Sequence, residues 1–214
     1  MVERGLSAAV LAGGMSRRMG TDKALLPLRP GDPPLVEVVV RRLQALTDDV
    51  FIVASDRPAY AAFGVPVVPD RYPAAGALGG IGTAIAAARE PACLVVACDM
   101  PFLNLALLRW MASQPREYDA LVPRLPGESR QGGGLVYQTL HAIYGKGCLP
   151  AIERRLAAGE RRVISFFPDV RVREIDLAGI RALDPSLRTF FNANTPEAAA
   201  EARRILDEAG SAEC

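Results

Sequence analysis

The chain has 214 residues, a length typical of one domain, and 50% of them are hydrophobic while 23% are charged. Lys+Arg 25 against Asp+Glu 24 leaves a formal net charge of +1, which excludes the broad basic surface typical of proteins that bind duplex nucleic acid. No apolar run approaches the ~20 residues that span a bilayer. We therefore expect a cytoplasmic globular protein that binds neither nucleic acid nor membrane.

The first half alternates between short runs of apolar, mostly branched residues and segments with helical spacing. Apolar runs of this length are typical of parallel strands, which are buried on both faces. In chain order the pattern predicts a strand, a helix, two strands, a helix, a strand and a helix, over residues 6–12, 35–46, 50–55, 65–68, 81–89, 92–98 and 103–111.

The second half is less regular. It predicts strands over residues 120–123, 135–137 and 170–175, and a helix over residues 148–158. A last helix follows Thr195, which can cap it, and Pro196 fits its first turn. Its expected buried stripe consists of Ala198, Ala202, Ile205 and Ala209. Strands and helices that alternate with short connections predict an α/β fold, a three-layer α/β/α sandwich around a Rossmann-like, mostly parallel sheet. We expect a single domain over residues 1–214.

The segment directly after the first expected strand carries the strongest chemical signal. It reads Leu11-Ala12-Gly13-Gly14-Met15-Ser16-Arg17-Arg18-Met19-Gly20-Thr21-Asp22-Lys23. Glycines let backbone N–H groups approach an anion, and Arg17, Arg18 and Lys23 can neutralise its charge. It is not a P-loop, because two residues separate Gly20 from Lys23, and it lacks the Gly-x-Gly-x-x-Gly dinucleotide fingerprint. The alternative is a turn whose basic side chains are only solvated.

Residues 11–25 resemble, without a gap, the signature Leu-Ala-Gly-Gly-x-Ser-x-Arg-Met-Gly-x-Asp-Lys-x-Leu of the molybdenum cofactor guanylyltransferases. That family belongs to the nucleotidyltransferase superfamily, with the fold of the nucleotide-diphospho-sugar transferases. The resemblance implies transfer of GMP from GTP to the phosphate of molybdopterin, with release of pyrophosphate. Gly13 favours guanine, because the related cytidylyltransferases usually carry Ala there. The implied nucleotide-binding residues of this segment are Leu11, Ala12, Gly13, Gly14 and Lys23, and the implied catalytic residues are Arg18 and Lys23.

Asp99-Met100-Pro101 directly follows the expected strand over residues 92–98. A carboxylate at the carboxyl end of a strand can reach a metal held over the sheet, although an isolated Asp-x-Pro is more often only a turn. Together with the glycine-rich segment, it resembles the magnesium-binding aspartate of the family. We therefore expect Asp99 to be catalytic, to bind nucleotide and to hold Mg²⁺.

A second glycine-rich segment, residues 70–82, is expected to be a packed loop that leads into the next helix. Its glycines would admit a flat ligand close to the backbone. The resemblance implies that guanine is recognised here, with Asp70, Leu78, Gly79 and Gly80 as nucleotide-binding residues. The family often has Pro where Ala77 stands.

Asn192-Ala193-Asn194-Thr195-Pro196-Glu197 is similar to the family's Asn-x-Asn-Thr-Pro-Glu ending. In an extended segment Asn192 and Asn194 lie on one side, where their amides can meet a polar or anionic ligand. We expect both to bind the acceptor, so that residues 1–115 form the nucleotide-binding half and residues 116–214 the acceptor-side half.

Other chemically suggestive residues have structural interpretations. His141, the only histidine, is expected to be structural or to line the substrate site, because no nucleophile elbow accompanies it. Residues 131–134 are expected to form a mobile loop. Residues 160–162 are expected to form a solvated helix end, with contact to the pterin phosphate as the alternative. A zinc site is not expected, because the cysteines form no Cys-x-x-Cys pair. They are expected to be reduced thiols at positions Cys93, Cys98, Cys148 and Cys214.

Several functions stay open beside guanylyl transfer. The alternatives are a CTP-dependent molybdopterin cytidylyltransferase, a nucleotidyltransferase with another phosphorylated acceptor, and a nucleotide-binding regulatory module without catalysis. The expected small molecules are GTP, molybdopterin and Mg²⁺. Contact with proteins that deliver molybdopterin or act as molybdoenzyme chaperones stays open as well.

Overall fold

The computed structural model of the protein describes residues 5–12, 23–55, 58–129 and 132–211. Within them one sheet has the strand order β3-β2-β1-β4-β7-β5-β6, and β8 pairs with β5. The strands are β1 (Leu6–Leu11), β2 (Val50–Val53), β3 (Val67–Val68), β4 (Ala92–Ala97), β5 (Ala120–Ser129), β6 (Gly132–Tyr137), β7 (His141–Gly145) and β8 (Val172–Ile175).

The sheet is mostly parallel, as the sequence predicts. β1 pairs in parallel with β2 and with β4, β2 with β3, and β5 with β8. β7 is antiparallel to both β4 and β5, so β4 and β5 run in the same direction on either side of it. β6 is antiparallel to β5 and lies at the end of the strand order. The carboxyl ends of six strands therefore point to one edge of the sheet, where ligands of doubly wound folds bind.

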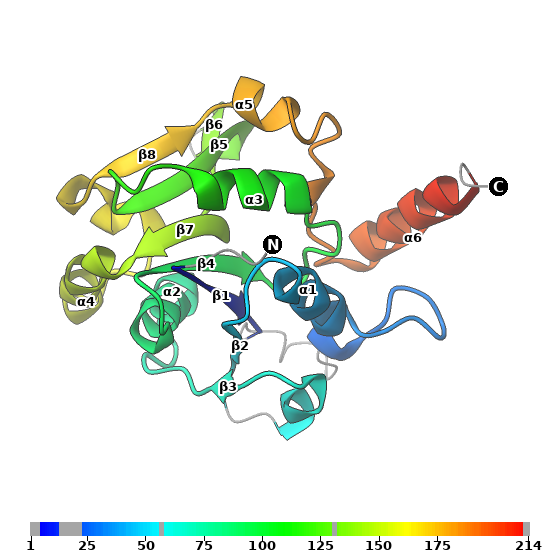
Figure 1. Ribbon diagram of the computed structural model, residues 1–214, viewed down its shortest axis with the longest axis horizontal. Coiled ribbons are helices and arrows are strands. Elements are labelled where there is room, and N and C mark those ends of the chain that lie inside the picture. Colours follow the sequence, from blue (N-terminus) through cyan, green and yellow to red (C-terminus); the bar gives the residue numbers. More distant parts are fainter. Residues whose placement is uncertain (1–4, 13–22, 56–57, 130–131, 212–214) are drawn as a thin grey trace.

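Helices cover both faces of this sheet (Figure 1). They are α1 (Leu35–Gln44), α2 (Gly76–Ala87), α3 (Leu105–Ser113), α4 (Leu149–Ala157), α5 (Leu177–Arg181) and α6 (Pro196–Ser211). α1 and α3 pack on one face and α2 and α4 on the other, whereas α6 extends away from the body. The three-layer sandwich expected from the alternation of elements is confirmed.

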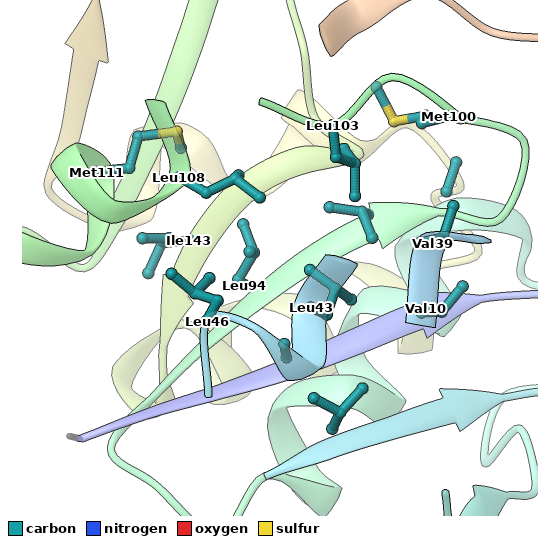
Figure 2. Packing of buried hydrophobic residues seen from close by; sticks show 14 of the residues in the cluster. Val10, Val39, Leu43, Leu46, Leu94, Met100, Leu103, Leu108, Met111 and Ile143 are labelled. Atoms are coloured by element: carbon teal, nitrogen blue, oxygen red, sulfur yellow. The ribbon is translucent and has the colours of Figure 1, made fainter. Parts of the chain in front are cut away.

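Alternation along the central strands divides the core into two layers. In β1, Ala8 and Val10 belong to the layer with α1 and α3, whereas Ala9 belongs to the layer with α2 and α4. Figure 2 shows the first layer, where Val39 and Leu43 of α1 meet side chains of the strands. Full burial of each such aliphatic side chain contributes ~2 kcal/mol before the entropy of ordering the chain is subtracted.

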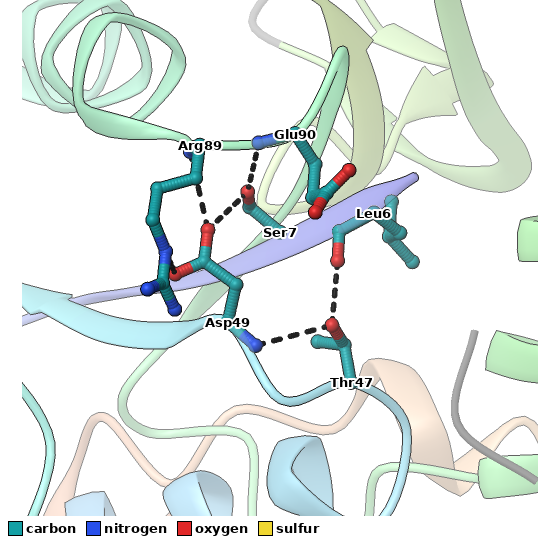
Figure 3. Close-up of polar contacts among 6 residues, drawn as sticks. All are labelled: Leu6, Ser7, Thr47, Asp49, Arg89 and Glu90. Carbon is teal, nitrogen blue, oxygen red and sulfur yellow. Dashed lines mark hydrogen bonds and ion pairs between the residues drawn. The ribbon is translucent and has the colours of Figure 1, made fainter. Parts of the chain in front are cut away.

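A polar network fastens the amino end of β1 (Figure 3). Ser7 Oγ donates to Asp49 Oδ2 over 2.5 Å, and Arg89 Nε donates to Asp49 Oδ1 over 2.7 Å. Burial raises the pKa of Asp49, but the hydrogen bonds from Ser7 and Arg89 outweigh this effect and lower it. Beside it, Thr47 Oγ1 donates to the carbonyl of Leu6 over 2.6 Å. This network ties the amino edge of the sheet, opposite the edge where ligands are expected.

Three expectations about local structure were wrong. Residues 76–82, expected to belong to a loop, form the first turns of α2. Residues 132–134, expected to be mobile, pair with β5 as part of β6, while residue 131 lies outside the described residues. The segment His141–Gly145 was not expected to be a strand, yet β7 lies between β4 and β5. Pairing with residues far away in the chain decides the two strand cases, and it leaves no local sequence signal.

The buried stripe of α6 is also shifted from the expected one. Thr195 Oγ1 accepts from the amide of Ala198 over 3.1 Å, so the expected cap is confirmed. Ala202 is buried as expected, but its partners on the packed face are Ala199 and Leu206. Ala198 and Ile205 are only half-buried, and the side chain of Ala209 lies outside the described residues. The buried face of α6 differs from the expected one because it packs on Leu28, Leu35, Phe102, Phe191 and Ala193.

Cys93, Cys98 and Cys148 form no disulfide, and Cys214 lies outside the described residues. Cys93 and Cys98 pack in opposite layers of the core. Burial raises the pKa of Cys148 to about 12, so this thiol is not a ready nucleophile. Across the described part of the chain, no helix is long and apolar enough to cross a membrane.

Candidate functional site

The carboxyl ends of β1 and β4 lie side by side. Leu11, the last residue of β1, is in register with Ala97, the last residue of β4. The amide of Cys98 then donates to the carbonyl of Leu11 over 3.2 Å. The glycine-rich segment and the segment that contains Asp99 therefore leave the sheet from adjacent strands, as the sequence predicts for a shared site.

The start of the glycine-rich segment is held from two sides. The amide of Ala12 donates to the carbonyl of Val53 over 3.0 Å, and Tyr60 Oη donates to the carbonyl of Ala12 over 3.3 Å. Gly13, Gly14, Arg17 and Arg18 lie outside the described residues. The hydrogen bond from Tyr60 was not predicted, because no local sequence pattern connects Tyr60 to the glycine-rich segment.

The segment continues into a single 3₁₀ turn, Lys23–Leu25. Ala24 is buried and Leu25 packs against the core, so the turn is anchored to the body of the protein. The backbone of Lys23 lies in this turn, and its side chain lies outside the described residues.

Asp99 is joined to the asparagine segment. Its side chain is half-buried, and its backbone carbonyl accepts from the amide of Ala193 over 2.8 Å. Ala193 is itself buried and lies between the two candidate asparagines. Asn192 Nδ2 donates to the carbonyl of Phe190 over 3.0 Å, and Asn194 is exposed. The structure thus brings the expected acceptor-binding segment to the residue expected to bind metal.

Asp70 connects the second candidate segment to α2. Asp70 Oδ1 accepts from Thr83 Oγ1 over 2.9 Å and from the amide of Tyr72 over 3.0 Å. The amide of Arg71 donates to Thr83 Oγ1 over 3.0 Å, and Thr83 is fully buried. One carboxylate oxygen of Asp70 therefore fixes the loop before α2, a structural use that the sequence analysis did not foresee.

Leu78, Gly79 and Gly80 lie in the first turns of α2, at the edge where β3 ends, and all three are buried. Leu78 belongs to the core. A Cβ added at Gly80 would lie 2.9 Å from Leu11 Cδ1, so glycine here allows α2 to approach the end of β1. The positions of Leu78 and Gly80 thus serve the packing of α2 against the sheet.

The loop before α2 holds an unusual backbone conformation. Ala74 has φ 64°, a left-handed value that is uncommon for residues other than glycine. No side chain caps the amino end of α2. The first turn of this helix therefore presents backbone N–H groups at the same edge as Asp99.

His141 is fully buried at the start of β7. Its Nε2 lies 2.9 Å from Thr189 Oγ1. Burial lowers the pKa of His141 to about 4, so the imidazole is neutral near pH 7. These features fit the structural role expected for it and not that of an exposed base.

In the described part of the chain, no group of three or more His, Cys, Asp or Glu side chains could hold a metal ion. The described residues therefore do not form a site in which protein side chains alone coordinate a metal ion. A half-buried carboxylate that follows the carboxyl end of a strand matches instead the needs of Mg²⁺, which takes one or two carboxylates and completes its shell with phosphate and water. Asp99 meets that description.

Comparison with known proteins gives a consistent assignment. The family model of the MobA-like NTP transferase domain matches residues 8–172. A probable molybdenum cofactor guanylyltransferase of Pelotomaculum thermopropionicum is 40% identical over 201 residues, which are 94% of this chain and 93% of that protein. Another, of Carboxydothermus hydrogenoformans, is 34% identical over 191 residues, covering 89% of this chain and 91% of that protein.

Among solved structures, molybdopterin-guanine dinucleotide biosynthesis protein A of Archaeoglobus fulgidus superposes with a TM-score of 0.77 at 24% identity. The superposition covers 94% of this chain and 99% of that one. A 4-diphosphocytidyl-2C-methyl-D-erythritol synthase of Anaerococcus prevotii superposes with a TM-score of 0.69 at 13% identity, covering 94% and 96%. At these identities the likeness establishes the fold.

Proposed function

Because the chain belongs to the family of MobA-like NTP transferase domains, we propose that it is a nucleotidyltransferase that transfers GMP from GTP to the phosphate of molybdopterin. The products are molybdopterin guanine dinucleotide and pyrophosphate. Relatives named molybdenum cofactor guanylyltransferases match nearly the whole chain and support this choice of nucleotide and acceptor. The structural observation that carries the proposal is the pairing of Leu11 with Ala97, which starts the glycine-rich segment beside Asp99.

The reaction does not need a general base. The attacking group is a phosphate monoester with a second pKa of about 6, so it is already mostly dianionic at pH 7. A chain whose only histidine is buried and neutral fits such a reaction. The protein must instead align two polyanions and offset their mutual repulsion.

We assign the triphosphate to the glycine-rich segment. Backbone N–H groups of Gly13 and Gly14 bind phosphate oxygens, and Arg18 and Lys23 offset their charge. Asp99 would hold Mg²⁺, which would supply positive charge to the phosphate oxygens and the leaving pyrophosphate. The half-buried position of Asp99 at the end of β4 supports this assignment.

The guanine is assigned to the start of α2, where Asp70 and the turn with Leu78, Gly79 and Gly80 face the same edge. The acceptor is assigned to Asn192 and Asn194, in the half formed by residues 116–214, opposite the nucleotide-binding half of residues 1–115. The hydrogen bond between Ala193 and Asp99 supports this, because it holds the asparagine segment at the end of β4. We place the reaction in the cytoplasm, with a molybdopterin-delivering protein or a molybdoenzyme chaperone as the partner to test.

The proposal is tested by pyrophosphate release from purified protein with molybdopterin, Mg²⁺ and one nucleotide at a time. We expect turnover with GTP, little with CTP or ATP, and none after Mg²⁺ is chelated with EDTA. Turnover with CTP in preference to GTP would make the protein a cytidylyltransferase. Tight nucleotide binding without pyrophosphate release would make it a regulatory module.

A further inference from the structure

The segment that carries the candidate asparagines is attached along the segment that follows β4. The amide of Asn104 donates to Thr189 Oγ1 over 3.0 Å, and the amide of Ala193 donates to the carbonyl of Asp99 over 2.8 Å. Between these points the rings of Phe102 and Phe191 meet edge to face, with centroids 5.7 Å apart. The order of contacts is opposite in the two segments, so residues 189–193 run antiparallel to residues 99–104.

One end of this attachment is fixed to the sheet by His141. Its residue partner across the strands is Val96, next to the last residue of β4. The imidazole Nε2 lies 2.9 Å from Thr189 Oγ1, and the ring packs on Phe190 with centroids 4.6 Å apart. His141 therefore contacts two consecutive residues of the segment that leads to Asn192.

Thr189 is suited to be the connecting point. A hydroxyl can donate one hydrogen bond while it accepts others, so Thr189 Oγ1 can serve the amide of Asn104 and the imidazole of His141 together. The amide of Thr189 donates to Asp184 Oδ2 over 2.9 Å, and Ser186 Oγ donates to Asp184 Oδ1 over 2.8 Å. His141, Thr189 and Asp184 are all buried, so water cannot readily replace these bonds.

Burial of the His141 imidazole costs more free energy of desolvation than burial of an apolar ring. His141 Nδ1 is buried and has no hydrogen-bond partner among the described residues. An apolar ring such as Phe would fill a similar space without this desolvation cost. The hydrogen bond from the other ring nitrogen to Thr189 is the property that such a ring could not provide.

We propose that His141 is a positioning residue for the acceptor side of the site: through Thr189 it holds the Asn192–Asn194 segment against Asp99. The inference rests on the proposed function for its catalytic consequence, but the positioning itself is a property of this fold. His141 touches neither nucleotide nor acceptor in this role. Its loss should change how often the segment is correctly placed, and so lower turnover more than GTP binding.

The test uses His141→Phe, which keeps the ring against Phe190 and removes the bond to Thr189. Hydrogen exchange of the Ala193 amide is measured by NMR, together with kcat and KM for pyrophosphate release. We expect at least tenfold faster exchange at Ala193, a kcat lowered about tenfold or more, and a KM for GTP within about twofold of the wild type. The amide of Ala12, which donates to Val53, should keep its exchange rate.

Thr189 provides an independent pair of variants. Thr189→Val should reproduce both effects, and Thr189→Ser, which keeps the hydroxyl, should restore them. Thr47→Val is the matched control, because Thr47 is also buried and hydrogen-bonded but lies at the opposite edge of the sheet (Figure 3). This control should leave both the exchange of Ala193 and kcat unchanged.

Two results would overturn the proposal. One is unchanged Ala193 exchange in folded His141→Phe, or in Thr189→Val if the first variant does not fold. The other is accelerated exchange with wild-type kcat, which would make the contact purely structural. Failure of the proposed function is recognised separately, because the wild type would then release no pyrophosphate while the exchange measurement still decides the positioning role.

Discussion

The backbone carbonyl of Asp99 accepts a hydrogen bond from the amide of Ala193 over 2.8 Å. This contact joins two segments that are far apart in the sequence and places both at the carboxyl end of β4. The same bond sets the position of Asn192 and Asn194 on either side of Ala193.

Replacement of Asp99 by Asn should abolish most turnover without unfolding the protein. The amide keeps the size of the side chain and the backbone bond to Ala193, but it removes the negative charge that holds Mg²⁺. We expect pyrophosphate release to fall about hundredfold or more, as when a charge-stabilising group is lost from a transition state. Asp48→Asn, at an exposed position, is the control for a lost carboxylate. Wild-type turnover in Asp99→Asn would reject the metal-binding role.

Replacement of Lys23 by Ala should weaken GTP binding. A hydrogen bond to a charged group contributes about 1.5–3 kcal/mol, so we expect the Kd for GTP, measured by calorimetry, to rise about 10- to 100-fold. Lys146→Ala is the matched control, because Lys146 is exposed and follows β7 at the amino edge of the sheet. An unchanged Kd in Lys23→Ala would reject the assignment of the triphosphate to Lys23.

The sequence predicts the strands around this site because each is a short apolar run buried on both faces. Leu6–Leu11 and Ala92–Ala97 match the expected strands within one residue at the carboxyl end. β7 was missed because its place between β4 and β5 depends on pairing with residues far away in the chain. Motifs likewise make Asp99 and Lys23 candidates for the site, but nothing local indicates that Ala193 bonds to Asp99 or that His141 reaches Thr189.

Replacement of Gly79 by Ala should damage the loop before α2. The added Cβ would lie 2.7 Å from the Cβ of Ala75 and 2.9 Å from the carbonyl oxygen of Tyr72, so the backbone of that loop must move. Overpacking of this kind costs about 1–3 kcal/mol, which exceeds the gain of ~1 kcal/mol from replacing a helical glycine. We expect a lower free energy of unfolding in urea and weaker GTP binding.

Gly134→Ala is the control for Gly79→Ala. Nothing lies within 4 Å of a Cβ added at Gly134, which is exposed on β6. This variant should keep the stability and the GTP affinity of the wild type. Equal behaviour of the two variants would mean that the loop before α2 is not held as tightly as the contacts of Tyr72 indicate.

His141 should make the protein less stable as the pH falls from about 6.5 to about 4. Burial is the largest influence on this imidazole and lowers its pKa from the usual value of about 6.5 to about 4. Between these two pH values the unfolded chain binds a proton at His141 that the folded protein does not bind. The free energy of unfolding therefore has its full value above the pKa of His141 in the unfolded chain and decreases as the pH falls below it. The shift corresponds to a loss of at most about 3 kcal/mol. The free energy of unfolding in urea is measured at pH 7 and pH 4.5 for the wild type and for His141→Phe. The carboxylates titrate in both proteins, so the difference between the two proteins isolates the effect of His141. A wild-type advantage over His141→Phe that stays the same at both pH values would contradict the buried, neutral imidazole.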